Sequence, residues 1–194
     1  SYFTVLRNCQ VYLDDKEVLP PTETPDNHLH PDREWYTTDV FTDYALHFME
    51  ESFEKHPDKP LFLYIAHNAP HFPLHAREED TKKYRGRFKD IGWDKLRQAR
   101  YERMVKMGLI DRKWALSPSD VPTWETYDEK MRDELDLKMA LYSAIIDRMD
   151  QNVGRIVNKL KAAGRLDNTL ILFMVDNGVC LLYTSPSPRD SSQS

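Results

Sequence analysis

Residues 160–178 have the sequence LKAAGRLDNTLILFMVDNG, in which a helical pattern ends and a continuous apolar run begins. Gly164 follows the last helical residues and suits the left-handed position that closes many helices. After an opening threonine, residues 169–175 are all apolar, and a run of this length predicts a strand buried on both faces. An Asp-Asn-Gly tripeptide at 176–178 ends the run, so polar side chains stand at the carboxyl end of the predicted strand.

The helix before this run gives the strongest periodic signal in the chain. Over residues 129–163 apolar side chains recur at alternating spacings of four and three, which predicts one helix roughly 50 Å long. These side chains are Leu135, Met139, Tyr142, Ile146, Met149, Val153, Ile156 and Leu160. The same repeat would suit a coiled coil, but charges are not paired along its flanks throughout, so a helix packed on a sheet is favoured.

Other elements are predicted nearer the start of the chain. Residues 38–55 predict a helix with Thr38 as its N-cap, and residues 94–107 predict a basic amphipathic helix. Residues 60–66 form a second continuous apolar run and predict another buried strand, whereas residues 3–19 predict a short hairpin. The buried face of the first helix is expected to carry Phe41, Tyr44, Ala45, Phe48, Met49 and Ser52.

Helices and buried strands that alternate in this way predict an α/β fold with a mostly parallel sheet. Ligands of such sheets bind beyond the carboxyl ends of the strands. Both predicted core strands run into polar residues at that end: one into residues 67–75, which contain three histidines, and the other into residues 176–178. We therefore expect the functional site at this edge of the sheet.

Composition excludes several classes of function. The 194 residues suit one domain of ordinary size, and their net charge of −5 gives no general attraction for nucleic acid. The sequence contains no run of eighteen apolar residues, so it predicts no membrane-spanning helix. The two cysteines, Cys9 and Cys180, have neither a second cysteine nor a histidine at metal-ligand spacing, so we interpret them as ordinary thiols.

Three histidines follow the strand predicted at 60–66. His67, His71 and His75 would share a helical face, but Pro70 and Pro73 disfavour a helix there. A histidine in a loop is usually an ordinary polar residue exposed to solvent, yet one at the carboxyl end of a strand is a better candidate for a site. We single out His71, whose imidazole could bind an anion or donate a proton to a leaving group.

The second polar cluster offers oxygen ligands. Asp176 and Asn177 supply a carboxylate and an amide oxygen, which suit Ca²⁺ or Mg²⁺ rather than Zn²⁺. An Asp-Asn-Gly tripeptide is also common in plain turns, and two ligands are too few for a complete Ca²⁺ site. The rest of the ligands must come from elsewhere.

Four ordered blocks of this sequence resemble the type I sulfatases, a family of the alkaline-phosphatase-like superfamily. The blocks are residues 36–39 with 42–43, residues 59–64 leading to 69–74, Tyr142 with 147–150 and 153–154, and residues 167–171 leading to 176–178. The intervening segment 84–127 resembles the bacterial arylsulfatases in particular. The resemblance implies an α/β fold in which packed helices cover a mostly parallel sheet that is incomplete at both ends. Residues 1–178 would be the central part of the catalytic domain, and residues 179–194 a disordered, non-native tail.

The resemblance also implies roles for the candidate residues. His71 matches the histidine that contacts the sulfate group, and Asp176 with Asn177 matches the second pair of Ca²⁺ ligands. The implied reaction is hydrolysis of a small-molecule or carbohydrate sulfate ester. His67 and His75 match no catalytic position of the family.

Other features of the family are missing from this sequence. Its nucleophile is a formylglycine made from a Cys/Ser-x-Pro-x-Arg motif, and the residues after Cys9 do not match that motif. Residues 185–189 match the motif at its first serine and its final arginine but carry serine where proline belongs, and we interpret this partial match as chance. We therefore expect the nucleophile, and the site of action of a formylglycine-generating enzyme, to lie outside this chain, which would be inactive by itself.

Two rival interpretations remain open. Phosphodiesterases and phosphonate hydrolases of the same superfamily often carry histidine where Asn177 stands, so Asn177 favours a sulfatase. The chain could also be a non-catalytic fragment that binds anions. The sequence does not identify the sulfate ester, the oligomeric state or the cellular compartment.

Overall fold

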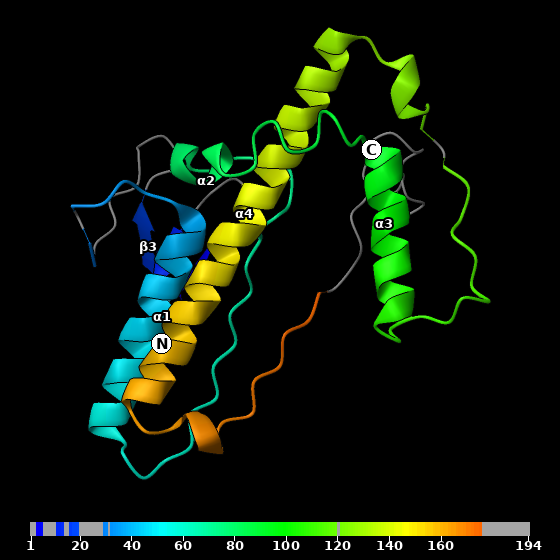
Figure 1. Cartoon of the computed structure of the whole chain (residues 1–194). Helices are drawn as coiled ribbons and strands as arrows, with labels where there is room; N and C mark the ends of the chain where they lie inside the picture. The colour runs from blue at the N-terminus through cyan, green and yellow to red at the C-terminus, as the bar shows by residue number, and fades with distance from the viewer. Residues whose placement is uncertain are drawn as a thin grey trace, which may run out of the picture.

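A parallel pair of long helices organises the molecule in this computed structural model, which describes residues 3–5, 11–13, 16–19, 29–30, 32–119 and 121–175. Helix α1 (Thr37–Lys55) lies beside helix α4 (Glu129–Ala162), as Figure 1 shows. Three side-chain contacts join the helices: residue 39 to 148, residue 43 to 155 and residue 50 to 159. Because the residue numbers rise together along both helices, the helices run in the same direction.

Helix α1 begins one residue before its predicted start. Its N-cap is Tyr36, whose carbonyl accepts the amides of Asp39 and Val40, so the prediction of Thr38 as N-cap is wrong. Thr38 lies buried in the first turn, where its carbonyl oxygen accepts the hydroxyl of Thr42 at 3.1 Å. The buried face confirms Tyr44, Ala45 and Met49 but also contains polar residues: Thr38, Asp39, Thr42 and Asp43.

Helix α4 has the boundaries that its repeat predicts, to within one residue. At its start the carboxylate of Asp128 accepts the amide of Met131 at 2.7 Å, which caps the first turn. At its end Gly164 adopts φ +66° and donates to the carbonyl of Lys161, while Arg165 donates to that of Leu160. These two bonds are the Schellman arrangement, so the prediction that Gly164 closes the helix is confirmed.

The face of α4 that is buried differs from the predicted apolar stripe. Leu135 and Leu160 are buried as expected, but Ile146 is exposed. The remaining buried positions are Asp136, Ala140, Ala144, Ile145 and Asn152. Most of the buried positions of α4 are therefore small or hydrogen-bonded side chains, and most residues of the predicted apolar stripe are only half-buried.

The segment between α1 and α4 folds around shorter helices: α2 (Glu78–Lys82), α3 (Trp93–Lys106) and the 3₁₀ turn η1 (Trp124–Thr126). Helix α3 confirms the prediction for 94–107, whereas α2 was not predicted. The fully buried carboxylate of Asp136 joins this segment to α4, because it accepts amides from Gly86, Phe88 and Lys89 and a hydrogen bond from Arg85. A second 3₁₀ turn, η2 (Leu166–Asn168), follows α4.

The hairpin predicted at 3–19 is confirmed. Strands β1 (Phe3–Val5), β2 (Val11–Leu13) and β3 (Lys16–Leu19) form one antiparallel sheet in the order β1-β2-β3. The predicted turn residues 14–15 lie outside the described residues.

Neither predicted core strand, residues 60–66 or 169–175, forms a hydrogen-bonded strand in the structure. Both run as extended coil in Figure 1. A strand needs a neighbour to accept and donate its backbone hydrogen bonds, and the described part of the chain supplies none to either segment. The mostly parallel sheet is therefore not confirmed in this chain.

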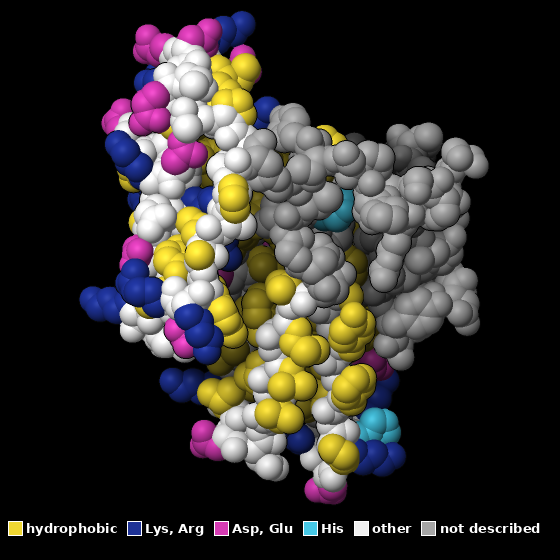
Figure 2. All heavy atoms as spheres, turned by 90° about the vertical axis from the view of Figure 1, so that its right-hand side faces the viewer, with side chains coloured by type: hydrophobic (Ala, Val, Ile, Leu, Met, Phe, Trp, Pro, Cys, Tyr) yellow, Lys and Arg dark blue, Asp and Glu magenta, His cyan; other side chains and the backbone are white. Residues whose placement is uncertain are grey.

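These two segments expose apolar side chains. In residues 61–66 exposure alternates, so that Phe62 (91% exposed) and Tyr64 (78%) face solvent while their neighbours are partly covered. Residues 170–175 are exposed throughout, Leu170 to 83%. Figure 2 shows hydrophobic side chains gathered on one face of the molecule. None of the helices in the described ranges is long and apolar enough to span a bilayer.

Candidate functional site

His71 lies in an exposed loop between the extended segment 60–67 and helix α2. We define residues 68–77 as the His71 loop. The amide of His71 donates to the carbonyl of Asn68 at 2.9 Å and closes a turn. Its Nδ1 lies 2.6 Å from the carbonyl oxygen of Phe72, and since a carbonyl only accepts, this contact favours the tautomer with the proton on Nδ1. The neutral ring then presents Nε2 as an acceptor, and the protonated ring presents it as a donor.

The structure does not bring the three histidines together into one site. His67 packs edge-on against Phe41, with ring centroids 6.0 Å apart, and burial lowers the pKa of His67. Neither of its ring nitrogens has a hydrogen-bond partner among the described residues. His75 is exposed, and its carbonyl oxygen accepts the hydroxyl of Tyr36 at 2.9 Å.

The predicted metal ligands cannot be placed. Asp176 and Asn177 lie outside the described residues, as do Cys9, Cys180 and the tail at 179–194. Within the described ranges no group of three or more histidine, cysteine or acidic side chains could hold a metal ion.

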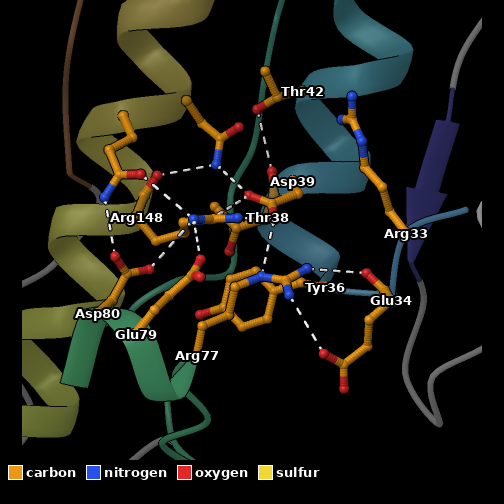
Figure 3. A network of polar contacts seen from close by, with 12 residues as sticks. Arg33, Glu34, Tyr36, Thr38, Asp39, Thr42, Arg77, Glu79, Asp80 and Arg148 are labelled. Carbon is orange, nitrogen blue, oxygen red and sulfur yellow. Dashed lines mark hydrogen bonds and ion pairs between the residues drawn. The ribbon is translucent and has the colours of Figure 1, made fainter. Parts of the chain in front are cut away.

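A network of charged and polar side chains, shown in Figure 3, joins α1, α2 and α4, with Asp39 and Asn152 buried and Glu34 exposed. The carboxylate of Asp39 accepts Nε and Nη2 of Arg148 at 2.9 and 2.8 Å, Nε of Arg77 at 3.2 Å, and Nδ2 of Asn152 at 2.7 Å. We call Glu34, Asp39, Arg77, Arg148 and Asn152 the polar cluster. Burial disfavours ionisation of Asp39, but the hydrogen bonds from Arg148 and Asn152 outweigh it and lower the pKa of this carboxyl.

A cleft of about 400 Å³ opens beside the polar cluster. Four arginines lie along it, and each makes an ion pair with a carboxylate: Arg33 and Arg155 with Asp43, and Arg77 and Arg148 with Asp39. Glu34 also pairs with Arg77, and Glu79 with Arg148, so four carboxylates face the four arginines, which favours a structural role for the cleft over anion binding.

The polar cluster also contacts the His71 loop. Arg77, the last residue of the loop, donates through Nη2 to the carbonyl of Glu34 at 2.9 Å, and its guanidinium lies over the ring of Tyr36, 5.2 Å from the centroid. Tyr36 in turn holds the carbonyl of His75. The loop that carries His71 is thereby attached to the start of α1.

Sequence reasoning missed the polar cluster as a unit. Asp39 and Arg148 are 109 residues apart in the sequence, and no local pattern pairs them. Periodicity gave no signal for it, because Asp39 does not lie on the apolar stripe predicted for this helix, which carries Phe41, Tyr44, Ala45, Phe48, Met49 and Ser52.

Comparison with known proteins identifies the family. The sequence model of the sulfatase family matches residues 8–192. The chain is 33% identical over 167 residues to an uncharacterised sulfatase of Schizosaccharomyces pombe, covering 82% of this chain and 29% of that protein. It is 31% identical over 122 residues to the arylsulfatase of Klebsiella aerogenes, covering 62% and 26%.

A third relative is the N-acetylglucosamine-6-O-sulfatase of Bacteroides thetaiotaomicron, 28% identical over 193 residues, with 75% of this chain and 34% of that protein covered. The chain thus spans about a quarter to a third of the length of these curated relatives. The match of the family model over most of the chain shows that it belongs to the sulfatase family.

Proposed function

We propose that the complete protein containing this chain hydrolyses sulfate esters. The observation that carries the proposal is the family match over residues 8–192, together with relatives named arylsulfatase and N-acetylglucosamine-6-O-sulfatase. The substrate would be a small-molecule or carbohydrate sulfate ester.

His71 would contact the sulfate group. Its position in an exposed loop supports this role, and the bond between Nδ1 and the carbonyl of Phe72 fixes one side of the ring. Nε2 is then the nitrogen that faces a ligand, and in the protonated ring it would donate a hydrogen bond to a sulfate oxygen or to the leaving oxygen.

Asp176 and Asn177 would contribute to a Ca²⁺ site. Their carboxylate and amide oxygens are hard donors of the kind that this ion prefers, so the donor set fits, and further ligands must come from other parts of the protein. A bound cation supplies positive charge for the sulfate oxygens. A formylglycine, installed by a formylglycine-generating enzyme, would supply the nucleophile from outside this chain.

The test is His71→Ala in the complete protein, with aryl sulfate as substrate. We expect kcat to fall about 100-fold or more, as is typical when a positioned acid or hydrogen-bond donor is removed. His75→Ala is the matched control, because it removes an exposed histidine side chain four residues away and leaves the carbonyl that Tyr36 holds. Equal kcat in His71→Ala and the parent would remove His71 from the site.

The same protein tests the substrate class and the metal. We expect faster turnover of an aryl sulfate than of an aryl phosphonate, and the opposite order would favour a phosphonate hydrolase. Removal of divalent cations should abolish turnover, and added Ca²⁺ should restore it to the parent but not to Asp176→Ala. Turnover that survives complete chelation would contradict the metal assignment.

A further inference from the structure

The His71 loop has few attachments of its own to hold its catalytic candidate in place. Between residues 68 and 75 of the described chain, the backbone hydrogen bond is that of the turn from His71 to Asn68, and the loop contains no helix or strand. The segment before the loop, residues 60–67, forms no strand pairing in the described part of the chain. Its position therefore depends on what fixes its far end.

Tyr36 and Arg77 fix that far end. The hydroxyl of Tyr36 donates to the carbonyl of His75 at 2.9 Å, across 39 residues of sequence. Burial and the nearby Asp39 raise the pKa of Tyr36, so its hydroxyl remains a donor at neutral pH. Arg77 covers the ring of Tyr36 and bonds to the backbone carbonyl of Glu34, so both residues join the loop to the chain just before α1.

The polar cluster makes this attachment stiff. Arg77 also donates to Asp39, and Asp39 accepts further hydrogen bonds from Arg148 and Asn152 of α4. The side chains of Arg77 and Arg148 are only about one-fifth exposed, so these charged bonds are stronger than surface ion pairs. Figure 3 shows Tyr36, Arg77, Asp39 and Arg148 side by side. The order of the loop thus comes from the two long helices.

We propose that Tyr36 and Arg77 are positioning residues, which hold the His71 loop so that the imidazole of His71 meets the sulfate group. The proposal rests on the function proposed above for His71. Neither residue would touch the substrate, and both would act through the backbone of residues 75–77.

The test uses Tyr36→Phe in the complete protein. Phenylalanine keeps the ring beneath Arg77 and removes only the hydroxyl that holds His75, so the fold is expected to persist. Loss of one hydrogen bond of ordinary strength should lower kcat about five- to tenfold, with KM changed less than about twofold. Hydrogen exchange measured by mass spectrometry should become faster in residues 68–76 and stay unchanged in α4.

The matched control is Tyr142→Phe, since the hydroxyl of this half-buried tyrosine of α4 makes no hydrogen bond in the described structure. It should change neither kcat nor exchange in the His71 loop. A second variant, Arg77→Lys, keeps the positive charge but lacks the planar fork that reaches Glu34 and Asp39 together, so it should loosen the loop as Tyr36→Phe does.

Faster exchange confined to the loop, combined with a lower kcat, would support the proposal. Unchanged exchange in Tyr36→Phe, or unchanged kcat with a loosened loop, would overturn it. The outcome for His71→Ala is separate: if that variant keeps full turnover, the role of His71 is wrong, while the exchange data still show whether Tyr36 and Arg77 hold the loop.

Discussion

Asp39 is a carboxylate whose side chain is only 13% exposed, and its charge is retained because arginines surround it. The bonds from Arg148 and Asn152 keep its pKa below the ordinary value despite burial. A group whose pKa is lower in the folded state than in the unfolded state stabilises the fold above its unfolded pKa. That stabilisation is lost as the pH falls through the folded pKa.

Asp39→Asn should therefore destabilise the chain in a pH-dependent way. We expect a loss of about 3 kcal/mol in the free energy of unfolding at neutral pH, because the variant leaves two arginines without their shared anion. The difference between parent and variant should begin to shrink below about pH 4, where the carboxyl of the unfolded parent takes up a proton, and it should be lost as the pH falls through the lower folded pKa. Urea denaturation followed by circular dichroism at several pH values measures both quantities.

Glu79→Gln is the control for this experiment. Glu79 pairs with the same Arg148 at 3.1 Å, but its side chain is mostly exposed. Its replacement should change stability by less than about 1 kcal/mol. A loss in Glu79→Gln as large as that in Asp39→Asn would show that burial does not decide the strength of these pairs.

Gly92 gives a second prediction at the residue scale. It adopts φ +79° directly before α3, and a Cβ placed there would lie 2.5 Å from Cγ of the buried Trp124. Gly92→Ala should lower the free energy of unfolding by about 2–4 kcal/mol, because left-handed strain and a steric clash add together.

Gly86→Ala separates these two causes. Gly86 has a similar φ of +84°, but nothing lies within 4 Å of its added Cβ. This variant should lose only the backbone term, about 1–2 kcal/mol. Thermal unfolding of both variants measures the difference, and equal losses would rule out a clash with Trp124.

At the scale of elements, the sequence predicted the long helices and the N-terminal hairpin well and the two core strands poorly. Helix boundaries depend on local signals, such as the Asp128 cap and Gly164, and these signals act within a few residues. The boundaries of α1, α3 and α4 therefore agreed with prediction to within one or two residues. The N-cap of α1 was misplaced because Thr38 is a good capping residue that tertiary contacts bury instead.

Apolar runs define a strand only if another strand lies beside them. Residues 60–66 keep the alternating exposure of a strand, but the described chain offers no partner for their backbone groups. The short helix α2 gave no periodic signal, since five residues are too few to show a repeat. It is held by tertiary contacts with α4, including those of the buried Asp80 with Gln151 and of Lys83 with Asp147.

Asp136 provides the prediction at this scale. Its buried carboxylate holds the segment 84–91 against α4 by accepting three amides and an arginine. In Asp136→Asn an amide group would face these donors, so we expect a loss of about 3 kcal/mol in the free energy of unfolding. Hydrogen exchange in residues 84–91 should also become faster.

Asp133→Asn, one turn earlier on α4, is the matched control. Its side chain is half exposed and pairs with the same Arg85 at 2.6 Å. Its replacement should alter stability by less than about 1 kcal/mol and leave exchange in residues 84–91 unchanged. If both variants behaved alike, the three amide bonds to Asp136 would not be what holds the segment.

At the scale of the whole molecule, the candidate site could be predicted only in outline. The sequence pointed to His71 because it follows an apolar run, and the structure places that residue in an exposed loop. The contacts that hold the loop join residues that are between 38 and 113 positions apart in the sequence, so no local pattern contains them. The remaining ligands are predicted to lie in other parts of a protein whose relatives are about three times as long as this match.

The described chain also exposes an apolar face. Phe62, Tyr64 and residues 170–175 present apolar side chains and unpaired backbone to solvent. Removing apolar surface from water lowers the free energy by about 25 cal/mol for each Å², and unpaired extended segments readily accept another strand. We therefore expect the chain by itself to associate increasingly with concentration, which sedimentation velocity would detect.

The double variant Phe62→Lys with Leu170→Lys tests which surface is responsible. Charges on both extended segments should oppose edge pairing and shift the chain toward monomer. The control double variant, Leu109→Lys with Trp114→Lys, replaces two apolar side chains that are each 61% exposed but lie in the turn after α3. It should leave association unchanged, because these residues lie in a turn and offer no extended backbone for strand pairing. A monomeric parent chain at every concentration, or equal effects of the two double variants, would show that the extended segments are not the associating surface.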